Sequence, residues 1–262
     1  MKITVLAENT TSSPSLCHEH GLSLFIECNN KKILFDVGQT DIFSHNAEKL
    51  CVDLSGVDFT IISHGHYDHT GGLLALREIN PTCPVYINEN AFSSFYNGVE
   101  KYIGMPKDSK NISHIIRTSD YLKIEDGIEL FTLNKQIEAF NINSFGLNVL
   151  RCDKYVADDF CHEQYLLIHE GNKKILISGC SHKGLINIMR CVQPDVFVGG
   201  FHYSKLDPAA DSVTLDGIAD NLLKLNCTFY TCHCTGVEQY NYLKTKLSNT
   251  LFYLSTGDIV EI

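Results

Sequence analysis

One short stretch, residues 61–72, constrains this chain more than any other part of its sequence. It reads IISHGHYDHTGG, and it continues the apolar run at residues 59–62. Such a run predicts a buried strand, so His64 and the residues after it lie in a loop at the carboxyl edge of a sheet. Loops at this edge carry the chemistry of many α/β folds. We therefore predict a functional site where this strand ends.

The loop supplies four side chains of the kind that bind metals, namely His64, His66, Asp68 and His69. Zn²⁺, Mn²⁺ and Fe²⁺ share imidazole and carboxylate ligands. His64 and His66 are two residues apart and face the same way in extended backbone, so they can bind one ion. Asp68 and His69 lie beyond the bend and can reach a second ion. We predict two divalent metal ions, with Zn²⁺ as first choice and Mn²⁺ or Fe²⁺ as alternatives; the competing interpretation is a solvated, histidine-rich loop.

The pattern HxHxDH at residues 64–69 resembles the signature of the metallo-β-lactamase superfamily. Four further segments share this resemblance, namely FDVG, ISGCSH, GGFH and TCHCTG at residues 35–38, 177–182, 199–202 and 231–236. The resemblance implies an α/β fold, the αββα metallo-β-lactamase sandwich, with one or two metals at the sheet edges. Residues 1–262 are then one metallo-β-lactamase-like domain. The segment EHGLS at residues 19–23 is similar to the branch of dihydropterin ribofuranosylaminobenzene-phosphate synthases.

Composition and charge narrow the classes of partner. The chain has 44% hydrophobic and 20% charged residues, which is typical of a globular protein. Acidic residues outnumber basic ones by 31 to 21, which gives a formal net charge of −10 without a basic cluster. We expect no nucleic-acid partner, because a phosphate backbone requires a basic face. No apolar run approaches membrane-spanning length, so we expect no membrane partner. We expect a small-molecule substrate and leave open whether the chain forms a homo-oligomer.

The cysteines predict the compartment. Eleven are present without a Cys-x-x-Cys pair, which favours free thiols in a reducing environment. Most of them are expected to pack as small hydrophobic side chains. Charged residues interrupt the apolar run within residues 1–8, so this segment does not resemble a signal peptide. We therefore expect a cytoplasmic protein.

Periodicity predicts two α/β halves around a poorly patterned middle. In the first half we expect a helix at 41–50, another at 70–79, and strands at 2–6, 22–27 and 32–37. In the second half we expect helices at 183–192 and 209–225, with strands at 165–168, 174–178, 195–200 and 227–231. Between the halves, residues 81–153 mix short strand-like pieces with Gly, Asn and Pro. We predict that they form an insertion, either a lid or a small subdomain.

The second half supplies further candidate ligands. Many relatives carry a metal-bridging aspartate at the position of Cys180, so the resemblance implies a thiolate ligand here; the alternative is a buried structural thiol. The third ligand of the first metal stays open among Asp159, His162 and His182. We favour His182 because it directly follows a strand. The resemblance makes His233 the last ligand of the second metal, although in extended backbone Cys232 and Cys234 would face the side opposite His233.

Several residues are candidates for roles beside the metals. His202 follows paired glycines and is a candidate proton donor or phosphate contact. The resemblance also suggests an active-site role for His20, and His20, His202, Asp159 and His162 are candidate substrate contacts. Asp36 ends a predicted strand, where its carboxylate can accept a hydrogen bond from a ligand histidine; the alternative is a cap for the following helix.

Two adjacent divalent ions would lower the pKa of a shared water towards neutrality. We therefore predict a metal-dependent hydrolase, or a related transferase, that uses a metal-activated water on a small anionic metabolite, which a phosphate group would suit. Asp68 and His202 are the predicted catalytic residues. The alternatives are a pterin-ribofuranosylaminobenzene-phosphate condensing enzyme, which the branch resemblance implies, and a non-catalytic metal-containing protein that binds a ligand.

Overall fold

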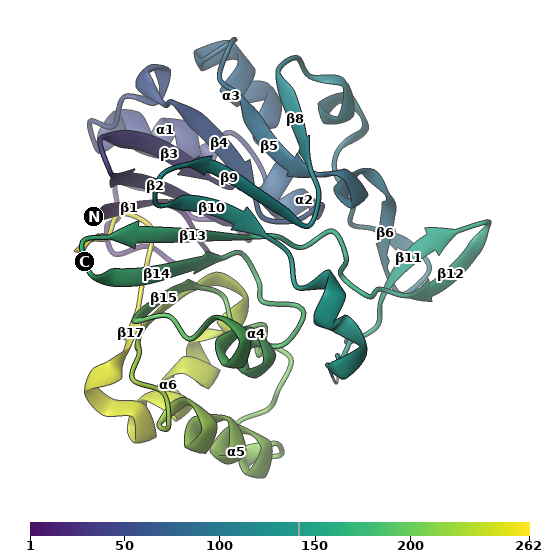
Figure 1. The fold of residues 1–262 in the computed structure, drawn as a ribbon, viewed down its shortest axis with the longest axis vertical. Helices are drawn as coiled ribbons and strands as arrows, with labels where there is room; N and C mark the ends of the chain where they lie inside the picture. Colours follow the sequence, from purple (N-terminus) through teal and green to yellow (C-terminus); the bar gives the residue numbers. More distant parts are fainter. Residues whose placement is uncertain (141) are drawn as a thin grey trace.

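Two seven-stranded sheets form the centre of the protein in the computed structural model, which describes residues 1–140 and 142–262 (Figure 1). The first sheet has the order β18 (Ile259–Glu261), β1 (Lys2–Ala7), β2 (Ser23–Cys28), β3 (Lys31–Phe35), β4 (Phe59–Ile62), β5 (Val85–Asn88) and β8 (Ile115–Thr118). The second has the order β17 (Leu251–Tyr253), β16 (Thr228–Thr231), β15 (Val196–Gly199), β14 (Lys173–Ser178), β13 (Tyr165–Glu170), β10 (Ile128–Phe131) and β9 (Tyr121–Glu125).

Helices cover the outer face of each sheet. The first sheet carries α1 (Ile42–Lys49), α2 (Tyr67–Thr70) and α3 (Leu73–Ile79), and the second carries α4 (Leu185–Val192), α5 (Ser212–Leu222) and α6 (Val237–Leu247) (Figure 1). This arrangement is the predicted αββα sandwich. Among residues 1–140 and 142–262, no helix combines the length and apolar character needed to cross a membrane.

Strand β13 shows how the sequence builds the layers. Leu166 and Ile168 belong to the core between the two sheets, whereas Tyr165 and Leu167 belong to the core under α4, α5 and α6. Successive side chains of a strand point to opposite faces, so a strand covered on both sides reads as a continuous apolar run. The same rule explains why the apolar runs at β4 and β14 mark buried strands.

The predicted helix at residues 70–79 is interrupted. A short turn, α2, ends at Thr70, and α3 begins at Leu73. Gly71 and Gly72 lie so close to other backbone that a Cβ would come within 1.9 Å of the Gln39 carbonyl oxygen and 2.2 Å of the Val37 carbonyl oxygen, respectively. Because these two glycines lack side chains, the loop that carries residues 64–69 packs tightly against the chain that follows β3.

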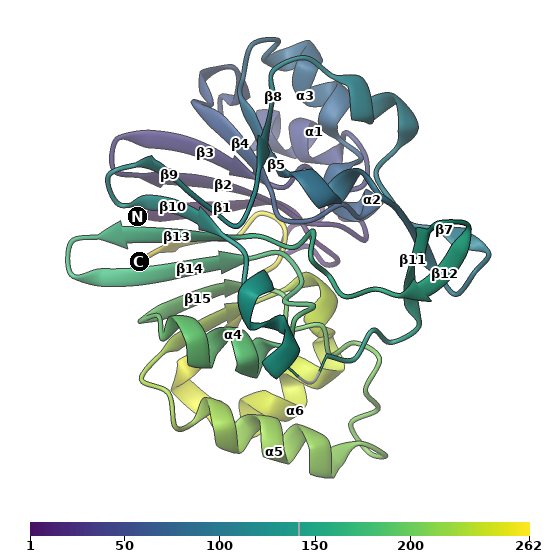
Figure 2. The same cartoon turned by 45° about the vertical axis from the view of Figure 1, so that its right-hand side comes forward.

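The structure divides residues 81–153 between the sandwich and a small separate sheet. Strands β5, β8, β9 and β10 belong to the two main sheets. The small sheet has the order β12 (Lys154–Ala157), β11 (Leu147–Arg151), β6 (Ser94–Asn97) and β7 (Lys101–Tyr102), and it projects from one side of the molecule (Figure 2). Residues 81–153 therefore do not form one separate body, and the four-stranded arm also includes residues after 153. That the arm is an insertion or a lid stays a prediction.

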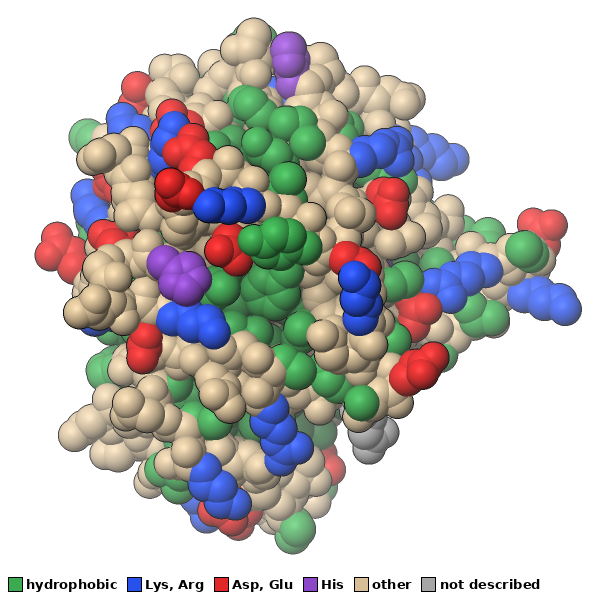
Figure 3. Space-filling view, viewed as in Figure 1, with side chains coloured by type: hydrophobic (Ala, Val, Ile, Leu, Met, Phe, Trp, Pro, Cys, Tyr) green, Lys and Arg blue, Asp and Glu red, His purple; other side chains and the backbone are tan. Residues whose placement is uncertain are grey.

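Charge is dispersed on the face shown in Figure 3. Lysine and arginine side chains lie among acidic and neutral ones over the sandwich and the arm. Two exposed lysines, Lys101 and Lys205, also line the pocket at the strand ends.

Candidate functional site

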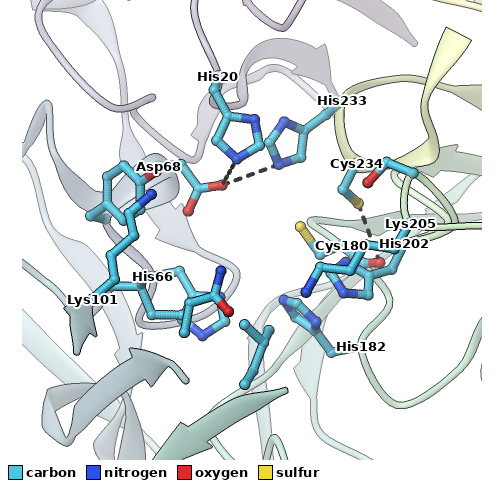
Figure 4. Close-up of a pocket in the computed structure, with 15 residues that line it drawn as sticks. His20, His66, Asp68, Lys101, Cys180, His182, His202, Lys205, His233 and Cys234 are labelled. Atoms are coloured by element: carbon cyan, nitrogen blue, oxygen red, sulfur yellow. Dashed lines mark hydrogen bonds and ion pairs between the residues drawn. The ribbon is translucent and has the colours of Figure 1, made fainter. Parts of the chain in front are cut away.

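The site lies at the carboxyl ends of four strands from both sheets. Strands β14, β15 and β16 run parallel, with Ser178 opposite Gly199 and Gly199 opposite Thr231, so the segments after them emerge at one edge. The loop after β4 meets them from the first sheet. The pocket between these loops is lined by residues that Figure 4 draws as sticks, among them His20, His66, Asp68, Lys101, Cys180, His182, His202, Lys205, His233 and Cys234.

Three imidazoles form the first cluster. Ligand atoms of His64, His66 and His182 lie within 4.8 Å of one another, and all three side chains are buried. The Nε2 atoms of His64 and His182 are 3.3 Å apart. Two nitrogens bound to a tetrahedral zinc at the usual bond length stand about 3.3 Å apart, so the spacing fits such an ion. Burial and the neighbouring imidazoles hold the pKa of His64 and of His182 well below the usual value, which favours the neutral, metal-binding form.

Asp36 orients two of the histidines from beneath. Its carboxylate accepts hydrogen bonds from the Ser63 hydroxyl and from His69 Nδ1, each at 2.7 Å. Because Ser63 gives its proton to Asp36, its oxygen accepts from His64 Nδ1 at 2.8 Å. His64, held neutral, therefore keeps its Nε2 lone pair for the pocket, and the bond on Nδ1 turns Nε2 of His69 to the pocket as well. The alternative of a helix cap does not apply, since the residue preceding α1 is Asp41.

The second cluster surrounds Asp68. Its Oδ2 atom lies 3.3 Å from His20 Nε2 and 3.4 Å from His233 Nε2 (Figure 4). The same oxygen lies 3.6 Å from His69 Nε2. Burial would raise the pKa of Asp68, but the imidazoles hold it well below its usual range. Burial likewise opposes protonation of His69, but Asp36 and Asp68 raise the pKa of His69 to about 9. Without a metal, the cluster thus favours a proton, and so a positive charge, on His69. A metal ion bound at this position would replace that proton and supply the positive charge.

Asn9, which follows β1, gives His20 and His233 opposite tautomers. His233 Nδ1 donates to Asn9 Oδ1 at 2.8 Å, so the Nε2 atom of His233 keeps a lone pair facing the pocket. Asn9 Nδ2 donates to His20 Nδ1 at 3.3 Å, so the Nε2 atom of His20 carries a proton towards Asp68. His233 is therefore suited to bind a metal, and His20 is suited to donate a hydrogen bond.

Cysteines form one wall of the pocket. Cys180 Sγ lies 3.3 Å from His69 Nε2, and its ligand atom also lies within 4.8 Å of those of His202 and Cys234. His202 stands beside His182, with ring centroids 4.2 Å apart. The Cys234 thiol donates to the Cys180 carbonyl oxygen at 3.6 Å.

The backbone after β16 corrects the expectation drawn from extended geometry. The strand ends at Thr231, and His233 adopts φ 51°, so the chain turns immediately. Cys232 packs in the core between the sheets, whereas His233 and Cys234 both line the pocket. Cys232 and Cys234 therefore do not share a face.

His162 supports the site from below. Its Nδ1 accepts a hydrogen bond from the Gly65 amide at 3.0 Å, so its Nε2 carries the proton that it donates to Asp158 at 3.2 Å. With both ring nitrogens engaged, His162 has no lone pair left for a metal or a substrate. The sequence did not single out Asp158, whose buried carboxylate also lies 3.9 Å from His66 Nε2. The imidazoles of His162 and His66 lower the pKa of Asp158 although burial acts to raise it.

Asp159 lies outside the site, contrary to its candidacy as a ligand or substrate contact. Its side chain is 41% exposed and forms an ion pair with Arg151 at 2.9 Å. The side chain of the neighbouring Asp158 points into the protein instead, because adjacent side chains on this segment point in different directions. Of the three open candidates for the first cluster, the structure brings only His182 together with His64 and His66.

Two lysines at the pocket were also missed from the sequence. Lys101 comes from β7 in the projecting arm, and Lys205 comes from the loop after β15. Lys205 Nζ donates to the Phe145 carbonyl at 2.6 Å, and Lys101 Nζ lies 5.6 Å from the centre of the Tyr67 ring. Nothing in the local pattern around either lysine marks it, because only the tertiary fold brings both to one pocket.

The sequence of this chain is similar to those of known metal-dependent proteins and their relatives. A sequence model described as the metallo-beta-lactamase superfamily matches residues 19–206. An uncharacterized protein of Methanocaldococcus jannaschii, MJ0448, is 30% identical over 99% of this chain and 100% of its own length. The 7,8-dihydropterin-6-methyl-4-(beta-D-ribofuranosyl)-aminobenzene-5'-phosphate synthase of the same organism is 27% identical over 100% of this chain and 96% of its own.

A solved structure shares the whole fold. The crystal structure of Tm1679, described as a metal-dependent hydrolase of the beta-lactamase superfamily, aligns with a TM-score of 0.83 at 27% identity, covering 100% of this chain and 99% of that one. This fold implies divalent metal binding, and the clustered imidazole, carboxylate and thiolate groups provide suitable ligands. The matched segment, the full-length relatives and the shared sandwich together place this chain in the metallo-β-lactamase superfamily.

Proposed function

We propose that this protein is a metal-dependent hydrolase, or a closely related transferase, acting on a small anionic metabolite. One observation carries the proposal: a three-imidazole cluster stands beside a carboxylate and imidazole cluster, with Cys180 between them. The Nε2 atoms of His64, His69 and His233 are turned to the pocket by hydrogen bonds on the opposite ring nitrogen. This is the arrangement that a pair of divalent ions requires.

The chain's own residues would share the work as follows. His64, His66 and His182 would hold one ion, and Asp68, His69 and His233 the other, with Zn²⁺ as first choice. Bound divalent ions supply an acidified water and Lewis-acid stabilisation of the reacting group.

His20 directs its Nε2 proton at Asp68 and fixes that carboxylate. His202 lines the pocket without a hydrogen-bond partner among residues 1–140 and 142–262, and both ring nitrogens are unpaired. It is therefore free to donate to a substrate oxygen or to a leaving group.

The substrate class follows from the charge of the pocket. The chain has a formal net charge of −10, yet Lys101 and Lys205 both line the cavity. Ammonium groups there attract a phosphate or carboxylate on the substrate. Ile103 and Leu147 line the same cavity and suit an apolar part of the molecule. We infer a metabolite that carries both an anionic group and an apolar portion.

A condensing reaction is the second candidate. The synthase from M. jannaschii that resembles this chain over its full length is named for forming a pterin product, and Cys180 replaces the bridging carboxylate expected of a dinuclear hydrolase. A Lewis-acid metal can assist bond formation as well as hydrolysis. A ligand-binding protein without turnover is the remaining alternative.

Replacement of His66 tests the function. The protein is loaded with Zn²⁺, Mn²⁺ or Fe²⁺ and assayed against phosphodiesters, phosphomonoesters, lactones and a pterin with ribofuranosylaminobenzene phosphate. We expect turnover of at least one hydrolysable substrate, and its loss in His66→Ala. His45→Ala is the matched control, because His45 lies on α1 with its side chain 60% exposed. Unchanged turnover in His66→Ala contradicts the proposal, and condensation without hydrolysis selects the second candidate.

A further inference from the structure

Two thiols and an imidazole meet on one wall of the pocket. The ligand atoms of Cys180, His202 and Cys234 all lie within 4.8 Å of one another. Cys180 is 3% exposed and Cys234 is 5% exposed, so both sulfurs are shielded from solvent. The three residues come from the segments after β14, β15 and β16, which the sheet register aligns.

The fold leaves space for the second sulfur by omitting a side chain. A Cβ placed on Gly200 would lie 2.3 Å from Cys234 Sγ. The Gly200 amide donates to the Gly179 carbonyl at 2.9 Å, and the Phe201 amide donates to Thr235 Oγ1 at 2.8 Å. These bonds tie the three segments to one another. The position of the Cys234 sulfur is therefore built into the backbone.

His202 presents an unpaired imidazole to the sulfurs. Its Nδ1 and Nε2 atoms are buried and have no hydrogen-bond partner among the residues that the structure describes. The residue also adopts φ 59°, a conformation that costs free energy outside glycine. An imidazole shielded in this way needs a partner that residues 1–140 and 142–262 do not supply.

A cation removes this deficit. We propose that Cys180, His202 and Cys234 form a sulfur-rich position for a soft divalent ion, Zn²⁺ or Cd²⁺, so that one ion bound by this chain has two thiolate ligands. On binding, both thiols release their protons to solvent, and the imidazole binds as the neutral base. Thiolate ligands favour Zn²⁺ and Cd²⁺ over Mn²⁺, which prefers oxygen. The inference rests on the same metal-binding pocket as the proposed function but goes beyond it, because neither ion of that function needs Cys234. While an ion occupies this position, His202 is a ligand and is not free to donate a proton.

Cobalt spectroscopy separates the two sulfurs. The protein is loaded with Co²⁺, and the near-ultraviolet thiolate-to-cobalt charge-transfer absorption is recorded. We expect this absorption to fall in both Cys180→Ser and Cys234→Ser, and to stay at the wild-type level in Cys232→Ser. Cys232 is the matched control, because it lies two residues from Cys234 but packs in the core between the sheets. An unchanged absorption in Cys234→Ser overturns the proposal.

Two measurements make the result independent of any one variant. Zinc-edge X-ray absorption averages over all bound zinc, so for the wild-type protein we expect a total of two zinc–sulfur bonds at about 2.3 Å per protein molecule; a total of one contradicts the proposal. Loss of a residue that only hydrogen-bonds to a metal ligand typically lowers metal affinity about 10- to 100-fold. Cys234→Ser removes a proposed ligand itself, so we expect it to weaken Cd²⁺ binding at least tenfold. Recovery of a Cys180–Cys234 disulfide from the protein as isolated also overturns it.

These readouts do not depend on turnover. A protein inactive on every substrate but with two sulfurs on its metal leaves this inference intact. An active hydrolase with one sulfur neighbour contradicts this inference alone.

Discussion

Replacing Asp36 by asparagine tests how the protein prepares its metal-type histidines. The fully buried carboxylate accepts three hydrogen bonds at 2.7 Å, from the Ser63 amide, the Ser63 hydroxyl and His69 Nδ1. The amide in Asp36→Asn keeps one oxygen acceptor and places an NH₂ group where two donors now point. The Ser63 hydroxyl can rotate, but His69 can avoid the clash only by losing its Nδ1 proton and keeping the proton on Nε2.

The magnitude follows from these contacts. A hydrogen bond to a charged group contributes about 1.5–3 kcal/mol, so we expect Asp36→Asn to lower the free energy of unfolding of the metal-free protein by that amount. A proton on His69 Nε2 occupies the lone pair that would bind a metal. Loss of such an orienting partner typically costs about 10- to 100-fold in metal affinity.

The assay combines chemical denaturation of the metal-free protein with Zn²⁺ competition against a chelator. Asp41→Asn is the matched control, because Asp41 is 60% exposed and precedes α1 away from the pocket. A Zn²⁺ affinity in Asp36→Asn equal to that of the wild type would refute the argument that Asp36 sets the tautomer of His69.

Three further predictions concern pH, substrate charge and tautomers. The pKa of His69 is raised from 6.5 to about 9, so its stabilising contribution to the metal-free protein is present below pH 6.5 and lost as pH rises through 9, by about 3 kcal/mol; denaturation at several pH values checks this. Lys101→Ala and Lys205→Ala are expected to raise KM for an anionic substrate about 3- to 30-fold with little change in kcat, and to leave a neutral analogue unaffected. Asn9→Leu is expected to lower Zn²⁺ affinity about 10- to 100-fold, and chelator competition measures it.

Controls distinguish these effects from general damage. Lys123→Ala removes an exposed lysine that pairs with Asp126 on the surface, and it should leave KM unchanged. Asp36→Asn should flatten the loss of stability between pH 6.5 and 9, since it removes one of the carboxylates that raise the pKa of His69. Equal KM changes for charged and neutral substrates in Lys101→Ala would contradict a role in binding the anion.

The sequence located one half of the site well because its signal is local. His64, His66, Asp68 and His69 follow a buried strand within one loop, and a periodic apolar run predicts where that strand ends. The sandwich followed from the resemblance, and the two-sided burial of strands such as β13 explains their apolar runs.

The remaining features depend on contacts between distant segments. Asn9 reaches His233 across 224 positions, and Lys101 enters the pocket from a small sheet whose strands have little pattern. Local spacing also misled where the backbone leaves regular geometry. The positive φ of His233 interrupts the extended backbone in which His233 and Cys234 would face opposite sides. At residues 158 and 159, the buried side chain is that of Asp158, whereas Asp159 pairs with Arg151 on the surface.

Anomalous diffraction at the zinc edge, from crystals grown with Zn²⁺, tests the central claim most directly. Our account predicts one peak among His64, His66 and His182 and another against Asp68, His69 and His233; the inferred sulfur-rich position adds a peak at Cys180, His202 and Cys234. A structure in which the pocket lacks zinc while these side chains keep the same positions would contradict it.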